Sequence, residues 1–165
     1  MIIALSQVST LHSPFADDVE EFSASECNSI DAWLTKLEQY VADHSLDRAR
    51  QLLDECGVTM PVASFQGGLL HTQGDQRKEA WQLFEQRLAL CRELKIGTMV
   101  VACDVPIVES SQDFSRIQMS LAQAAEQAAA HEVKLALEIQ ANRQATASSL
   151  LTMFPMTRIA TIPMP

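Results

Sequence analysis

Glu138 is the acidic side chain whose position in the sequence most favours chemistry. It ends the apolar run Leu135-Ala136-Leu137, which has the composition of a buried strand. Removing a carboxylate from water is costly unless a metal ion or another cation compensates its charge. Such a carboxylate could hold a divalent metal ion or move a proton as a general acid or base. The residue alone does not distinguish these roles from that of a solvated glutamate at a strand end.

Three further polar side chains follow segments that we expect to be strands. His12 lies in the loop after the first, Lys36 follows the second, and Gln66 precedes Gly67-Gly68 at the end of the third. Each can contact a substrate, and the glycine pair allows a ligand to approach the backbone closely. A solvated histidine, a surface turn and a loop hinge are the alternatives, and the glycines lack the spacing of a phosphate-binding motif. We predict that His12, Lys36 and Gln66 bind substrate.

Apolar segments of strand length alternate with amphipathic segments of helical length along most of the chain. The segment 98–103 is almost entirely apolar, which is typical of a parallel strand that is covered on both faces. Ser45 and Gly57 mark the start and the end of one helix, as an N-cap and a C-cap. These patterns predict an α/β protein with five strands, at 2–8, 29–34, 58–65, 98–103 and 133–139, and four helices, from 13, over 45–56, over 76–95 and from 110.

The predicted order is a strand and a helix repeated four times and closed by a fifth strand. Strand starts are separated by roughly 28 to 40 residues, the size of a βαβ unit. A partial (β/α)8 barrel and a five-stranded flavodoxin-like binding or regulatory domain share this order, and both bind ligands at the carboxyl ends of their strands. The first strand ends in Gln7-Val8-Ser9-Thr10, with neither the acidic residues nor the glycine-rich turn of a flavodoxin-like domain. The partial barrel is therefore favoured.

Composition excludes several classes of protein. The 165 residues are 47% hydrophobic and 20% charged, which is enough apolar material for a core. The net charge of -9 disfavours nucleic acid as a partner. No stretch approaches about 18 apolar residues and no secretory signal follows Met1, so we expect a cytoplasmic protein without a membrane partner. No C-x-x-C pair occurs among the four cysteines, which favours core thiols at Cys27, Cys56, Cys91 and Cys103.

Four short motifs, taken in order, give the chain a family resemblance. They are Ile3-Ala4-Leu5-Ser6, Ala63-Ser64-Phe65-Gln66-Gly67-Gly68, Val100-Val101-Ala102-Cys103 and Leu135-Ala136-Leu137-Glu138. Together they resemble the xylose isomerase-like TIM-barrel superfamily, whose members include sugar-phosphate isomerases and epimerases and, more distantly, endonuclease IV. The resemblance covers roughly residues 1–140. It implies that the α/β fold is a partial (β/α)8 TIM barrel, incomplete at the C-terminus.

The resemblance also implies a divalent metal ion, Mn, Mg, Co or Zn, at the barrel mouth and a small carbohydrate or polyol as substrate. Glu138 matches a strand-five glutamate that is commonly a metal ligand and that, in isomerases and epimerases, also moves a proton through an enediolate. A metal ion polarises the carbonyl, and an adjacent carboxylate can then remove the acidified C–H proton. By this resemblance Glu138 is the metal ligand and the catalytic residue of a sugar phosphate isomerase or epimerase.

The chain departs from the family near its C-terminus. A complete barrel takes about 250 residues and eight strands, and no Asp or Glu occurs from Ile139 onward, where Pro155, Pro163 and Pro165 crowd the end. We expect residues 1–140 to be the barrel part and residues 141–165 to be an atypical tail left by truncation or a frameshift. We also expect the fragment to hold metal poorly, to be inactive and to self-associate through exposed strand edges.

Overall fold

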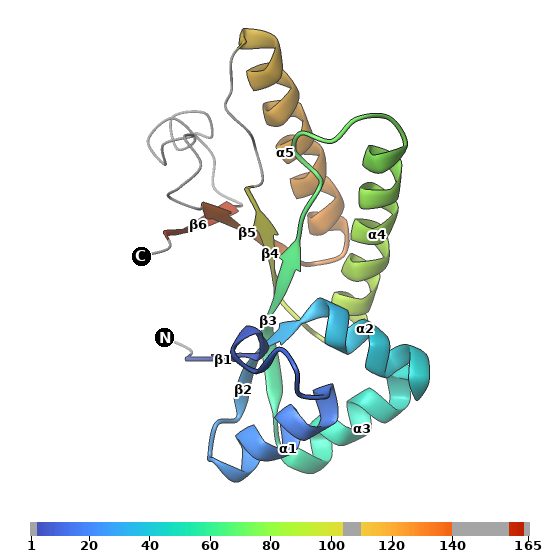
Figure 1. Ribbon diagram of the computed structural model, residues 1–165, viewed down its shortest axis with the longest axis vertical. Helices are drawn as coiled ribbons and strands as arrows, with labels where there is room; N and C mark the ends of the chain where they lie inside the picture. The colour runs from blue at the N-terminus through green and yellow to red at the C-terminus, as the bar shows by residue number, and fades with distance from the viewer. Residues whose placement is uncertain (1–2, 104–109, 140–158, 164–165) are drawn as a thin grey trace.

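A computed structural model describes residues 3–103, 110–139 and 159–163 (Figure 1). The strands are β1 Leu5–Ser6, β2 Ser29–Trp33, β3 Thr59–Gln66, β4 Thr98–Ala102, β5 Lys134–Ile139 and β6 Ile159–Pro163. The helices are the 3-10 helix η1 Gln7–Thr10 and the α-helices α1 Phe15–Ala24, α2 Leu34–Asp43, α3 Leu46–Cys56, α4 Gly74–Glu93 and α5 Ser111–Ala130. The alternation confirms the predicted α/β class.

The order of the strands decides between the two architectures. The sheet runs β1-β2-β3-β4-β5-β6, and every neighbouring pair is parallel. Helices α1 to α5 all lie on the same side of this sheet (Figure 1). A doubly wound, flavodoxin-like sheet reverses its strand order at a switch point and carries helices on both faces. That alternative is wrong, and the partial (β/α)8 barrel is confirmed.

The strands are also staggered in the way a barrel requires. Ser6, the last residue of β1, pairs with Asp31, two residues before the end of β2. Trp33, the last residue of β2, pairs with Ser64, again two residues before the end of β3. Closing a sheet into a barrel needs such a stagger between neighbouring strands. This stagger brings the carboxyl ends of β1, β2 and β3 to the same end of the barrel, where they form part of its rim.

The structure corrects two of the predicted elements. Among the described residues 3–8 of the predicted strand over 2–8, only Leu5–Ser6 form a strand, because Ser6 accepts a hydrogen bond from the Val8 amide at 3.3 Å and so caps η1. Serine side chains that bond their own backbone in this way compete with strand pairing. The prediction also missed α2, which begins at Leu34 directly after β2 without a capping side chain. By contrast, Ser45 caps α3 and Gly57 ends it with a φ of 64°, as predicted.

Side chains on one face of the central strands pack against the helices. Ile30 and Ala32 on β2, Ala63 on β3, and Met99 and Val101 on β4 are almost completely buried in one hydrophobic cluster. Successive side chains of a strand point to opposite faces of the sheet. The residues between these therefore face the other side of the sheet, which is the interior side of a barrel.

Cys91 on α4 is fully buried in this cluster, and its burial predicts a pH dependence of stability. Burial raises the pKa of its thiol from about 9.0 to about 12, against the smaller opposing effect of the Arg87 charge. Between these values the unfolded chain loses the thiol proton and the folded chain keeps it. The contribution of this thiol to stability is therefore complete below the lower value and declines as the pH rises through the window.

We expect this decline to be visible in urea unfolding of the wild type and of Cys91→Ala across a series of pH values. Below the ordinary pKa of the thiol, the difference in free energy of unfolding between the two proteins stays constant. Above it, the difference shrinks by about 1.4 kcal/mol for each pH unit. A difference that stays constant through the window contradicts the burial of the Cys91 thiol.

The C-terminal segment lies largely outside the described residues. Residues 159–163 form β6, which pairs in parallel with β5 from Leu135↔Ile159 to Ile139↔Pro163. The prediction that residues 141–165 are a foreign tail stays a prediction, although part of that segment extends the sheet. Within the described part of the chain, none of the helices has the length and apolarity needed to cross a membrane.

Candidate functional site

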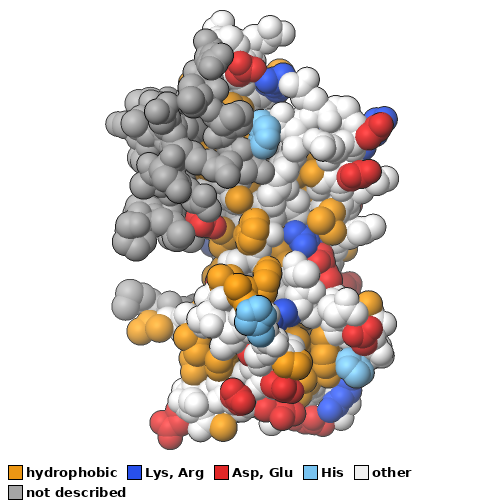
Figure 2. Space-filling view, viewed as in Figure 1, with side chains coloured by type: hydrophobic (Ala, Val, Ile, Leu, Met, Phe, Trp, Pro, Cys, Tyr) orange, Lys and Arg blue, Asp and Glu red, His pale blue; other side chains and the backbone are white. Residues whose placement is uncertain are grey.

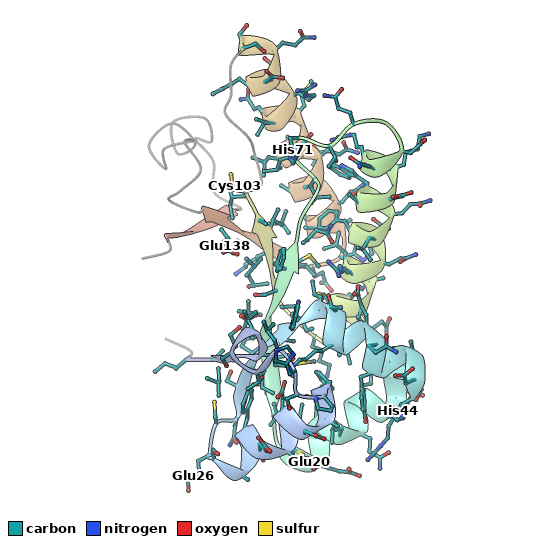
Figure 3. The ribbon with its side chains drawn as sticks, viewed as in Figure 1. Glu20, Glu26, His44, His71, Cys103 and Glu138 are labelled. Atoms are coloured by element: carbon teal, nitrogen blue, oxygen red, sulfur yellow. The ribbon has the colours of Figure 1, made fainter. Side chains whose placement is uncertain are left out.

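Glu138 lies on the interior side of the sheet near the rim. Its strand neighbours Leu135 and Leu137 are 3% and 1% exposed and belong to the helix-packed core, so Glu138 faces the opposite side. It pairs with Ala102 on β4, and its backbone oxygen accepts a hydrogen bond of 2.9 Å from the amide of Cys103. Figure 3 shows Glu138 and Cys103 close together at this end of β4 and β5. The half-buried carboxylate is thus placed where barrel enzymes bind substrate.

The described residues do not complete a metal site around Glu138. Among them, no group of three or more His, Cys, Asp or Glu side chains is arranged to hold a metal ion. Hard divalent ions need several oxygen or nitrogen donors, and one carboxylate supplies too few. Glu138 could serve as one ligand, and the remaining donors are not provided by this part of the chain.

A second carboxylate, Asp31, lies on the same side of the sheet and was missed by the sequence analysis. Ile30 and Ala32 on either side are fully buried toward the helices, so Asp31 faces the interior. Its Oδ2 accepts a hydrogen bond of 2.8 Å from Ser6, and its Oδ1 accepts one of 2.7 Å from Ser64. The alternation of polar and apolar residues along β2 separates Asp31 from the core positions, but it does not distinguish Asp31 from a residue on a solvated face.

His12 is exposed in the loop between η1 and α1. This loop follows β1 and therefore belongs to the rim that carries the carboxyl ends of the strands. Nearby, Val8 and Leu11 are 45% and 46% exposed, and Figure 2 shows hydrophobic side chains gathered on the surface over η1. The position agrees with a substrate contact, and the role of His12 stays a prediction.

Lys36 forms a buried ion pair. Its Nζ donates to the carboxylate of Asp18 at 2.7 Å, and the two side chains are 9% and 1% exposed. It also donates to the backbone oxygen of Thr10. Gln7, itself fully buried, donates to the same Asp18 oxygen at 3.0 Å and accepts from the Trp33 amide at 3.0 Å. These bonds tie η1 and the start of α2 together, so Lys36 supports the loop that carries His12.

Gln66 points toward the helices and not into the barrel. It is 1% exposed, its Nε2 donates to the backbone oxygen of Gly67 at 2.7 Å, and its Oε1 accepts from Arg87 at 3.2 Å. Arg87 also donates to the backbone oxygen of Phe65 at 3.0 Å and to both carboxylate oxygens of Glu38 at 2.6 and 2.9 Å. This buried cluster fixes the carboxyl end of β3. Direct binding of substrate by Gln66 or Lys36 is not tested by these contacts, and each already has protein partners.

The predicted site residues thus lie at one end of the sheet without forming one cluster. Lys36 donates to the backbone oxygen of Thr10, two residues before His12. Gln66 and Glu138 belong to separate strands and point to opposite sides of the sheet. The interior of the rim carries Glu138 on β5 and Asp31 with its two serines on β1 to β3. Carboxylates and hydroxyl groups can both form hydrogen bonds to a hydroxylated substrate, and a carboxylate can also act as a general base.

Comparison with known proteins agrees with this geometry. The family model of the xylose isomerase-like TIM barrel matches residues 20–157. The chain belongs to this family. Membership confirms the resemblance found in the sequence, and it accounts for the sequential parallel strands and the placement of the helices on one side. No curated protein matches the sequence.

Solved structures show the same xylose isomerase-like fold. The probable 3-DHS dehydratase AsbF, involved in petrobactin synthesis, from Bacillus anthracis superposes with a TM-score of 0.82 at 16% identity, over 99% of this chain and 62% of that one. A D-psicose 3-epimerase in the presence of D-fructose gives 0.74 at 15% identity, over 99% and 63%. The IolI protein with a bound zinc atom gives 0.72 at 21% identity, over 84% and 51%.

These likenesses show the fold of this xylose isomerase-like chain and leave its activity open. The chain spans 51%, 62% and 63% of the lengths of the three proteins. Since about two fifths or more of each neighbour has no counterpart here, any activity of the whole barrel belongs to a proposal.

Proposed function

We propose that this chain forms part of a sugar or polyol isomerase or epimerase, in which Glu138 moves a proton at the carbon beside the substrate carbonyl. The observation that carries the proposal is the position of Glu138, half-buried on the interior side of β5 and one residue before the end of the strand. Family membership supports the same chemistry, because one neighbour in this fold is a D-psicose 3-epimerase.

Proton transfer at the carbon beside the carbonyl places two requirements on the carboxylate. It must lie within hydrogen-bond reach of the C–H proton, and it must accept that proton and return it to the same carbon or its neighbour. The interior side of the rim is also where a substrate carbonyl enters a barrel. We therefore assign the proton transfer to Glu138.

The family resemblance suggests a divalent metal ion beside this glutamate, which when bound would polarise the carbonyl. Zinc is bound by the neighbour IolI. Glu138 is the residue of this chain that would contribute a ligand, and the described residues supply no second or third donor next to it. We assign no catalytic step to a metal ion here, and metal use by this chain stays a prediction.

The chain on its own is expected to be inactive. One carboxylate without the other side of the barrel cannot hold a substrate in a reactive geometry, and the loss of orientation alone removes several orders of magnitude of rate. We expect no interconversion of ketohexoses above the uncatalysed rate, with or without added manganese, when products are followed by chromatography.

Circular dichroism of the same sample is the control, since it shows whether the chain is folded during the assay. A folded chain that turns over ketohexoses at a rate proportional to its concentration would show that the described residues already form a complete site, against this proposal.

A further inference from the structure

The hydrogen bonds around Asp31 decide what kind of ligand group it can receive. Ser6 and Ser64 donate to its two carboxylate oxygens from the strands on either side. A serine hydroxyl has one proton, and both serines use that proton on Asp31. The three side chains therefore have no proton left to donate, and only acceptor lone pairs remain toward the barrel interior.

A cluster of acceptors selects ligand groups that donate. The hydroxyl groups of a sugar or polyol are donors and fit it, whereas a phosphate group brings negative charge and acceptor oxygens against a carboxylate. The cations nearby do not change this balance. Lys36 is paired with Asp18 at 2.7 Å and Arg87 with Glu38 at 2.6 Å, so the charge of each is already compensated.

The cluster also lies where a substrate of the proposed reaction would reach it. Ser6 is the last residue of β1, and Asp31 and Ser64 stand two residues before the ends of β2 and β3. Asp31 is half-buried.

We propose that Asp31, held by Ser6 and Ser64, binds hydroxyl groups of an unphosphorylated sugar or polyol and selects it over its phosphate ester. Asp31 is thus a specificity-determining residue, distinct from the proton-transferring Glu138. The inference rests on the proposed function, because it names the substrate class of the same site.

Titration of the isotope-labelled chain with a ketohexose, and separately with its 1-phosphate and 6-phosphate, tests the inference by amide NMR. We expect the neutral sugar to shift the amide resonances around Asp31 and Ser64, and each phosphate ester to bind there about tenfold or more weakly. The Asp31→Asn variant is expected to bind the neutral sugar about tenfold more weakly than the wild type does. Its preference for the neutral sugar over the phosphate esters is also expected to be smaller, because the charged acceptor is gone. Ser64→Ala keeps the carboxylate and is expected to keep the preference.

Asp47→Asn is the matched control, since the Asp47 side chain is 91% exposed on α3 and has no hydrogen bond to the Asp31 cluster. Phosphate esters that bind as tightly as the neutral sugar overturn the inference, as do sugar-induced shifts that occur around Glu138 and not around Asp31. Both of these results leave the proposed function standing. Absence of any sugar-induced shift around Asp31 and Ser64 also overturns the inference. It leaves the proposed function standing, because proton transfer by Glu138 is tested separately in a completed barrel.

Discussion

Replacing Arg87 with alanine (R87A) is expected to lower the free energy of unfolding by about 3 kcal/mol. The guanidinium is 9% exposed, pairs with both oxygens of Glu38, and donates to the backbone oxygen of Phe65 and to Gln66. Its removal leaves a carboxylate and two further acceptors without their donor in the protein interior. This value is at the lower end of the range for breaking a buried ion pair, because Glu38 is 29% exposed and keeps part of its hydration.

Urea unfolding followed by circular dichroism measures this effect, with Arg92→Ala as the matched control on the same helix. Arg92 is exposed, and its truncation is expected to change the free energy of unfolding by less than about 0.5 kcal/mol. The double variant R87M/E38L removes both charges and is expected to recover part of the loss. If R87A were no less stable than Arg92→Ala, the buried cluster at the end of β3 would not exist in solution.

The helices that the sequence predicts best are those with local signals. Ser45 and Gly57 stand at the two ends of α3, and Ser110 caps α5 by accepting from the Asp113 amide at 3.1 Å. The helix α2 has no such boundary, since Trp33 ends β2 and Leu34 begins the helix. Its buried Leu34 and Leu37 do have helical spacing, and that spacing is the signal that could have predicted it.

The site was harder to predict because its partners are distant in the sequence. Lys36 stands in a segment that resembles a surface turn, and its partner Asp18 is separated from it by 18 positions. Arg87 and Glu38 are 49 positions apart. The order of the elements was enough to place Lys36 and Gln66 at or after the ends of their strands. Local patterns carry no information about distant pairs, so the protein partners of these two residues could not be predicted.

Glu138 could be found from the sequence because a charge at the end of an apolar strand is unusual in itself. Asp31 could not be singled out in the same way, since β2 has polar residues at alternate positions and looks like a strand with one solvated face. Only the strand order shows that this face is the interior side of a barrel, and only the register brings Ser6 and Ser64 to the same carboxylate.

Replacing Glu138 with glutamine (E138Q) is expected to have the largest effect on chemistry once the barrel is complete. Glutamine keeps the size of the side chain, but an NH2 donor replaces one of the two acceptor oxygens and the side chain can no longer accept and return a proton. Loss of a positioned general base typically lowers a rate by about 100-fold to 10,000-fold. The change is made at the rim, on a half-buried side chain outside the helix-packed core, so the fold is expected to tolerate it.

The most direct test uses a chimera in which this chain replaces the matching 63% of the D-psicose 3-epimerase to which it is similar in fold. Incorporation of solvent deuterium into the carbon beside the carbonyl of a ketohexose is measured by NMR in D2O. The exposed Glu79→Gln on α4 serves as the control for the loss of one negative charge. We expect exchange in the chimera, the same exchange with Glu79→Gln, and a loss of at least about 100-fold with E138Q. A folded chimera that exchanges the proton equally well with E138Q would contradict the assignment of the reaction to Glu138.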